Sequence, residues 1–180
     1  IDICSGKDAP LSNAVRILGA CVLAPFDAHP DQGGRAHNIC EPEGQDLLFR
    51  LAWSRCIAFA HSAPPCSDMS MIKFFPGGPQ PIRSPSALDG CPDQAPWANA
   101  PLQDSSTFHL CVIDALNAVW CCGGHIGWEN PPTSMALLFD EVSAFLRRIK
   151  AVIFPVARCK FDPSIGKSYL LASTFPPLRR

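Results

Sequence analysis

The chain has 180 residues and a formal net charge of −1 at pH 7, and 47% of its residues are hydrophobic. This composition excludes a disordered chain, and the near-zero net charge gives no overall signature of nucleic-acid binding. Ten cysteines in 180 residues fall below the roughly 8–10% typical of small disulfide scaffolds, and none of them form a C-x-x-C pair. We therefore expect reduced cysteines and an intracellular, reducing compartment, which would be the nucleus in a eukaryote.

No apolar run approaches the roughly 18 residues that a membrane-spanning helix needs, so no membrane partner is expected. A basic segment followed by an apolar one, as in a signal peptide, is not visible either. Because Ile1 already belongs to an apolar, strand-like segment, we expect the chain to be an excised domain.

Short apolar runs alternate with amphipathic segments along the chain. In chain order, they predict a strand at 1–4, a helix at 9–18, a strand at 21–26, a helix at 45–53, a strand at 56–60, a helix at 105–121, a strand at 125–128, a helix at 134–148 and strands at 149–156 and 168–174. Strands that alternate with helices predict a single α/β domain over residues 1–180, with a mostly parallel sheet.

One segment interrupts this alternation. Residues 74–104 are rich in proline and glycine, and a segment of that composition is not expected to form regular structure. A loop of this length inside a compact domain is usually functional or disordered. We therefore interpret residues 71–104 as a long insert between the third strand and the helix that follows it.

Polar turns follow the carboxyl ends of the first four predicted strands, which is the edge where open α/β sheets bind ligands. The turn at Ser5, Gly6 and Lys7 leads from a strand into a helix and can bring backbone N–H groups to an anionic ligand. Asp27 ends the second predicted strand, where an acidic side chain can bond ribose hydroxyls. An ordinary β–α turn, and a helix cap or surface turn for Asp27, remain the alternatives.

The turns after the third and fourth predicted strands carry a cysteine and a glutamate. Pro64 and Pro65 stiffen the first turn and place Cys66 at the end of its strand, where a thiolate can act as a nucleophile. Glu129 ends the next strand, and adjacent parallel strands would bring its carboxyl group close to Cys66. Such a pair suits addition to an aromatic heterocycle, although a cysteine in a loop and a glutamate at a strand end are each more often structural or solvated.

These blocks occur in the order of a known family, and the chain resembles the C5-cytosine DNA methyltransferases. The first block of that family matches residues 2–8, and its P-C-x-x-x-S block matches Pro65 to Ser70. Its E-N block matches Glu129 and Asn130. The resemblance spans about residues 1–156, and the phrase Gly-Gly-His before Glu-Asn-Pro-Pro looks most like divergent copies carried by mobile elements.

The resemblance implies a Rossmann-like methyltransferase fold with helices on both faces, S-adenosylmethionine as the cofactor and DNA as the partner. Cys66 would attack C6 of a flipped cytosine while Glu129 bonds N3 of the ring. The implied cofactor-binding residues are Ile3, Ser5, Gly6, Lys7, Asp27, Asn38, Ile39 and Pro64. The implied DNA-binding residues are Ser70, Lys73 and Arg83, with plain solvation as the alternative for Lys73 and Arg83.

Three departures from the family keep other functions open. Lys7 and Asp8 stand where the family prefers a second glycine, Asn38 replaces an acidic residue, and the later family blocks and the target-recognition domain are not recognisable. A catalytically inactive binding module is therefore one alternative. An amino-methyltransferase acting on adenine is another, because residues 130–133 read N-P-P-T, a partial match to its motif. A zinc protein lacks supporting ligand spacing, so no metal is expected.

Overall fold

The computed structural model describes residues 1–74, 76–77, 80–157 and 168–176. Within these ranges the elements are β1 (Asp2–Ile3), α1 (Pro10–Ile17), α2 (Pro42–Ala52), β2 (Phe59–Ser62), α3 (Asn99–Cys121), β3 (His125–Asn130), α4 (Asp140–Arg148), β4 (Val152–Ala157) and β5 (Ser168–Ser173). Short 3-10 helices lie at Pro30–Gln32, Gly34–His37, Met71–Phe74, Pro96–Ala98 and Met135–Leu138. Of the helices in these ranges, none is long and apolar enough to cross a membrane.

The five strands form one mixed sheet in the order β1-β2-β3-β5-β4. β1, β2 and β3 are parallel neighbours, whereas β5 runs antiparallel to both β3 and β4. The protein is therefore an α/β protein, and the predicted parallel arrangement holds for its first three strands. The reversal at β5 fits the short spacing of β4 and β5 in the chain, because residues 158–167 are fewer than the roughly dozen residues that a crossover between parallel neighbours needs.

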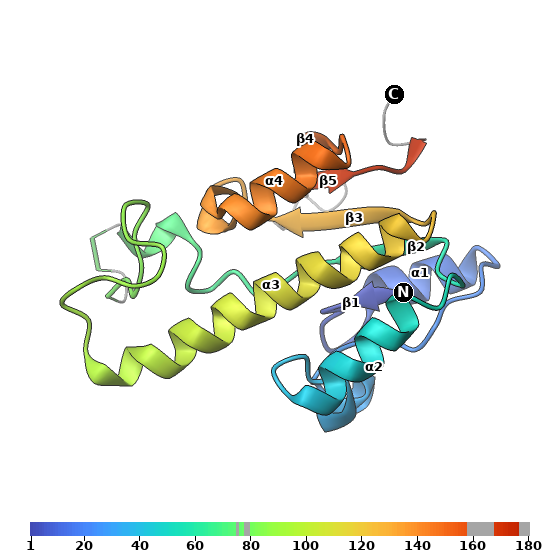
Figure 1. Ribbon diagram of the computed structural model, residues 1–180, viewed down its shortest axis with the longest axis horizontal. Coiled ribbons are helices and arrows are strands. Elements are labelled where there is room, and N and C mark those ends of the chain that lie inside the picture. The colour runs from blue at the N-terminus through green and yellow to red at the C-terminus, as the bar shows by residue number, and fades with distance from the viewer. Residues whose placement is uncertain (75, 78–79, 158–167, 177–180) are drawn as a thin grey trace.

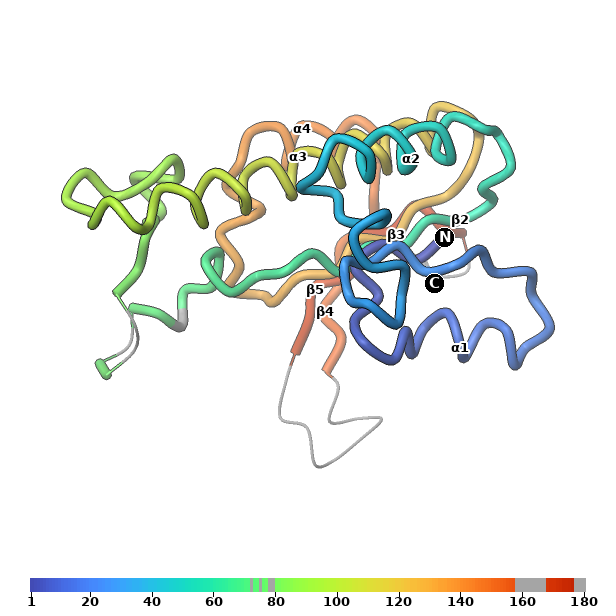
Figure 2. Tube along the Cα trace, turned by 90° about the horizontal axis from the view of Figure 1, so that it is seen from below, coloured from blue at the N-terminus to red at the C-terminus, as the bar shows by residue number. Residues whose placement is uncertain are grey.

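Helices cover the two faces of the sheet unequally. Figure 2 shows α2, α3 and α4 on one side of the strands and α1 on the other. On the three-helix side, Leu116 and Val119 of α3 are buried in one core cluster with Ile126 and Trp128 of β3. In Figure 1, α3 runs past the sheet and carries the proline-rich segment at its N-terminal end. This extension places the insert next to the carboxyl ends of the strands.

The second predicted strand, at 21–26, is not a strand in the structure. Only Phe26 pairs with β1, through the Phe26 N–H donating to the Asp2 carbonyl and the Cys4 N–H donating to the Phe26 carbonyl, both at 2.8 Å. Pro25 precedes it and has no N–H to extend a ladder. The chain thus pairs with one side of β1 at Phe26 and with the other side at β2. Such a reversal of strand order is a topological switch point, outside which α/β sheets bind ligands.

Two further predictions differ from the structure. α3 begins at Asn99, inside the segment expected to be irregular, because Pro101 lies in the first helical turn, where its missing N–H costs nothing. The predicted helix at 134–148 is instead a 3-10 helix and α4, separated by Phe139 in an extended conformation with φ −68° and ψ 128°.

Candidate functional site

A short antiparallel ladder joins the turn that follows Cys66 to the turn that follows Glu129. The Met71 N–H donates to the Thr133 carbonyl at 3.2 Å, and the Met135 N–H donates to the Met69 carbonyl at 2.7 Å. Ser70 and Ser134 form the bridge between them. We call this contact, residues 69–71 with 133–135, the turn-to-turn ladder. It holds together two turns that are far apart in the sequence and that carry the predicted catalytic residues.

Glu129 faces a cavity of about 300 Å³ at the carboxyl edge of the sheet. Cys4 and Ser5, from the turn after β1, line the same cavity, together with His61 and Ala63 at the end of β2. The Glu129 side chain is 32% exposed. The structure therefore brings a predicted catalytic residue and a predicted cofactor-binding residue, Ser5, into one cavity.

His61 lies between two carboxylates in this cavity. Its Nδ1 is 3.3 Å from Asp2 Oδ1, and its Nε2 is 3.9 Å from Glu129 Oε2. The Ser12 hydroxyl of α1 donates to Asp2 Oδ2 at 3.1 Å, which fixes the Asp2 carboxylate. The His61 side chain is 12% exposed, and of its two carboxylate neighbours only Asp2 lies within hydrogen-bond distance. Sequence analysis missed His61, although a titratable residue directly after the predicted strand at 56–60 was an available signal.

Asn130 points to the opposite face of β3 from Glu129, because successive side chains of a strand alternate. It is 1% exposed, and its amide atoms have no hydrogen-bond partner among the residues that the structure describes. The E-N pair therefore contributes one side chain to the cavity and one to the interior.

The turn after β1 is held by Asp27. The Gly6 N–H donates to Asp27 Oδ2 at 3.0 Å, and the His29 N–H donates to Asp27 Oδ1 at 2.8 Å. Gly6 has a φ of +70°, a conformation that L side chains rarely adopt. Each Asp27 oxygen has a second lone pair, so the carboxylate can still accept from a ligand. Burial raises the pKa of the neighbouring Cys4 thiol, which keeps it protonated.

Three predicted cofactor-binding residues meet in a second cavity, of about 130 Å³. Asp27, Asn38 and Ile39 line it, with Pro65 from the turn after β2 and Phe108 from α3 as apolar walls. The cavity lies outside the switch point at β1, where a carboxylate beside apolar walls suits a nucleoside.

No family model matches this chain, and no curated protein or solved structure matches it either. The site therefore has to be interpreted from its own geometry.

The remaining predicted cofactor-binding residues have different environments. Ile3 is buried in the core, and its carbonyl accepts from the Ala63 N–H at 3.2 Å. Lys7 is exposed, and its carbonyl accepts from Gln32 Nε2 at 2.7 Å. Pro64 is buried. The contacts of Ile3 and Lys7 are made by their backbone carbonyls, and none of the three side chains lines either of the two cavities.

Cys66 is partly buried at the start of the loop that leads to the turn-to-turn ladder. It lies outside the linings of the two cavities above, whereas its neighbour Pro65 lines the smaller one. In the described parts of the chain, no three His, Cys, Asp or Glu side chains gather in a way that could hold a metal ion.

The predicted DNA-binding residues do not share one surface. Ser70 belongs to the turn-to-turn ladder, and Lys73 lines a third cavity beside the insert. Arg83 has 0% exposure and forms an ion pair with Asp68 Oδ2 at 2.9 Å. The buried side chain of Arg83 is therefore neither solvated nor accessible to a phosphate in this structure. Its ion pair with Asp68 connects the insert to the turn after Cys66.

Proposed function

We propose that this chain is a cytosine-C5 DNA methyltransferase domain with a Rossmann-like fold. The observation that carries the proposal is the turn-to-turn ladder, which holds the turns after Cys66 and Glu129 together beside the carboxyl edge of the sheet. The parallel order of β1, β2 and β3 and the switch point at β1 support the fold.

The cofactor in this proposal is S-adenosylmethionine, which supplies an electrophilic methyl group when bound. The cavity at Asp27, Asn38 and Ile39 fits its nucleoside part by chemistry, since carboxylate and amide groups stand beside apolar walls. Asp27 would accept from the ribose hydroxyls, and Asn38 would bond the adenine amino group. Ser5, which lines the Glu129 cavity, and its neighbour Gly6 would contact the rest of the molecule.

In the reaction, the Cys66 thiolate forms a bond to C6 of a cytosine that has been flipped out of the duplex. Glu129, as a carboxylic acid, donates to N3 and neutralises the charge that develops on the ring. C5 becomes nucleophilic and accepts the methyl group, after which a base removes the C5 proton and the bond from C6 to sulfur breaks. As the bond from C6 to sulfur breaks, N3 returns its proton to the Glu129 carboxylate, which leaves Glu129 as a carboxylic acid for the next cycle.

The decisive experiment incubates the full chain with S-adenosylmethionine that carries a tritiated methyl group and with duplex DNA. We expect tritium in DNA for the native chain, loss of transfer for Cys66→Ser, and little change for the matched control Cys121→Ser, whose cysteine is exposed on α3. Mass spectrometry of the product nucleosides should find 5-methylcytosine. Transfer that survives Cys66→Ser contradicts the proposed mechanism.

The two alternatives give different results in the same assays. An inactive binding module would bind S-adenosylmethionine in calorimetry without any transfer. An adenine amino-methyltransferase would produce N6-methyladenine and would not need Cys66. The structure gives less support to the second alternative, because the side chain of Asn130, the first residue of the N-P-P-T motif, is buried on the face away from the Glu129 cavity.

A further inference from the structure

The ends of the helices bring together cations that the proposed methyl transfer does not use. α2, α3 and α4 each lead into one of the strands β2, β3 and β4, which run in the same direction. All three helices therefore end at the amino edge of the sheet, at the other end of the strands from the Glu129 cavity (Figure 1). The exposed cations at this edge are Arg55, after α2, and Arg147, Arg148 and Lys150, at the end of α4. We call these four residues the basic edge.

The charge of the basic edge is not neutralised within the described part of the chain. Arg55, Arg147 and Lys150 have no ion-pair partner among the residues that the structure describes. Arg148 donates from Nη2 to Asn117 Oδ1 of α3 at 2.7 Å, which holds the guanidinium over α3 without cancelling its charge. The four positive charges are therefore open to an anionic partner.

Two of these cations stand on backbone that favours glycine. Arg55 has a φ of +62° and Lys150 a φ of +52°. α4 ends in a hydrogen-bonded motif that usually has glycine at the position of Lys150. α1 and α3 end in the same motif, with Gly19 and Gly123 at that position. Strained residues of this kind often mark functional positions, so we looked for a function of the two side chains.

Stabilisation of the helix ends does not account for the strained cations. The carbonyl dipoles at a helix C-terminus stabilise a cation in the last turn, and Arg147 and Arg148 already occupy that turn in α4. α3 ends at the same edge with no basic residue in its last turn. A partner that binds through charge gives Arg55 and Lys150 the role that the helices do not need.

The chemistry of the basic edge favours an acidic segment of another protein. Three of its four cations are arginines, and a guanidinium group can bond both oxygens of a carboxylate. Trp53 adds an apolar surface that is 57% exposed, between the end of α2 and Arg55. Its carbonyl accepts from the Cys122 thiol at 3.8 Å, which places it beside the end of α3. Tryptophan and arginine together are the residues that protein interfaces favour.

We propose that the basic edge binds an acidic segment of a partner protein. Carboxylates of the segment would pair with Arg55, Arg148 and Lys150, and an apolar side chain would pack on Trp53. Clusters of arginine recognise acidic motifs in this way. Because the basic edge and the Glu129 cavity lie at opposite ends of the strands, this partner and the DNA of the proposed function would occupy different surfaces. The inference concerns binding alone and does not depend on methyl transfer.

The test measures fluorescence anisotropy on the full chain with a labelled peptide of about ten residues, in which glutamates surround one phenylalanine. A second peptide has glutamine in place of every glutamate. We expect the glutamate peptide to bind at least about 10-fold more tightly, because only its carboxylates pair with the basic edge. Its affinity should fall steeply as the salt concentration rises to about 1 M, where surface charges are screened.

Two double variants separate the charge from the fold. Arg55→Gln with Lys150→Gln should weaken binding of the glutamate peptide by about 10-fold, the size of two exposed ion pairs. Arg55→Gly with Lys150→Gly should weaken it equally without lowering the urea midpoint, because glycine relieves the strained backbone.

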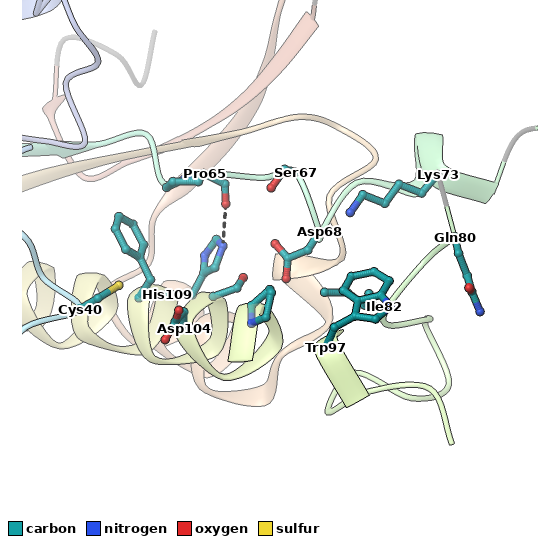
Figure 3. Close-up of a pocket in the computed structure, with 13 residues that line it drawn as sticks. Cys40, Pro65, Ser67, Asp68, Lys73, Gln80, Ile82, Trp97, Asp104 and His109 are labelled. Atoms are coloured by element: carbon teal, nitrogen blue, oxygen red, sulfur yellow. Dashed lines mark hydrogen bonds between the residues drawn. The ribbon is translucent and has the colours of Figure 1, made fainter. Parts of the chain in front are cut away.

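A tryptophan pair tests the apolar contact. Trp53→Ala should weaken binding of the glutamate peptide by about 5-fold, as expected for an interface anchor. The matched control is Trp97→Ala, which removes an exposed tryptophan from the cavity beside the insert, near the opposite end of α3 (Figure 3). This control should leave the affinity unchanged.

Each contrary result overturns the inference. Equal affinity for the two peptides, or no binding at about 1 mM peptide, would show that the edge does not select carboxylates. Unchanged affinity in both double variants would place the peptide elsewhere, and a lower urea midpoint with unchanged affinity would assign the two cations to the fold. Duplex DNA that binds more tightly than the peptide, and through Arg55 and Lys150, would replace the protein partner by a nucleic acid. Absence of methyl transfer in the same preparation bears on the proposed function alone.

Discussion

Replacing Arg83 by methionine should cost more stability than a surface substitution, because this side chain connects three parts of the fold. Arg83 Nη1 donates to the Leu88 carbonyl at 2.8 Å, and Nη2 donates to the Leu102 carbonyl at 2.9 Å. Nη2 also lies 2.9 Å from Asp68 Oδ2. Methionine fills a similar volume but leaves the buried Asp68 carboxylate unpaired. Breaking a buried pair in this way costs about 3–5 kcal/mol.

Urea unfolding followed by circular dichroism measures this loss as a lower midpoint at an unchanged slope. A second substitution makes the test specific. In the native chain Asp68→Asn should destabilise, because it removes the partner of a buried Arg83. In the Arg83→Met chain the same substitution should stabilise, because it removes an unpaired charge. A loss below about 1 kcal/mol for Arg83→Met, the size of an exposed pair, or a destabilising Asp68→Asn in both chains, would refute the reasoning.

Three further predictions concern titratable and reactive groups. Burial lowers the pKa of His109 from its ordinary value of 6.5, so the unfolded chain gains a proton before the folded chain does and the folded state loses stability as the pH falls below that value. Between pH 7.5 and 5.5, the urea midpoint should therefore fall less for His109→Gln than for the native chain. An equal fall of the midpoint in both chains would contradict this. Iodoacetamide should alkylate the exposed Cys56 faster than Cys4, whose thiol pKa is raised by burial; peptide mass spectrometry that finds the reverse order would contradict it. Because Glu129 is the acid in the proposed reaction, Glu129→Gln should slow methyl transfer by about 100-fold, and an unchanged rate of transfer would contradict that role.

The order of strands and helices was largely predictable from the sequence, because it depends on local apolar patterns. α1 and α2 each have a proline in their first turn, and β2 and β3 each overlap an apolar run of the sequence. The segment at 21–26 defeated the same reasoning, because pairing depends on a partner strand and only Phe26 reaches β1. The reversal of β5 was equally hidden, since sequence periodicity carries no strand direction.

The candidate site was predictable where residues follow strand ends, and unpredictable where distant segments meet. Asp27 was predicted because it ends a predicted strand, whereas Asn38 and Ile39, which line the same cavity, were predicted only from the family resemblance. Arg83 was misjudged because a single cation among prolines gives no sign of a buried partner. The turn-to-turn ladder also has no local signature, since its two halves lie on different turns.

The turn-to-turn ladder also has a consequence for how the molecule folds. Its two halves are separated in sequence by the insert, by α3 and by β3, so closing it carries the entropy cost of a long loop. We therefore expect the turn after Cys66 to acquire its final shape only after β3 has joined β2. In native-state hydrogen exchange, the Met71 and Met135 amide protons should then exchange together, and both should exchange faster than the amides of β2 and β3. Assembly of the site is in this sense a late folding event, separate from formation of the core that supports it.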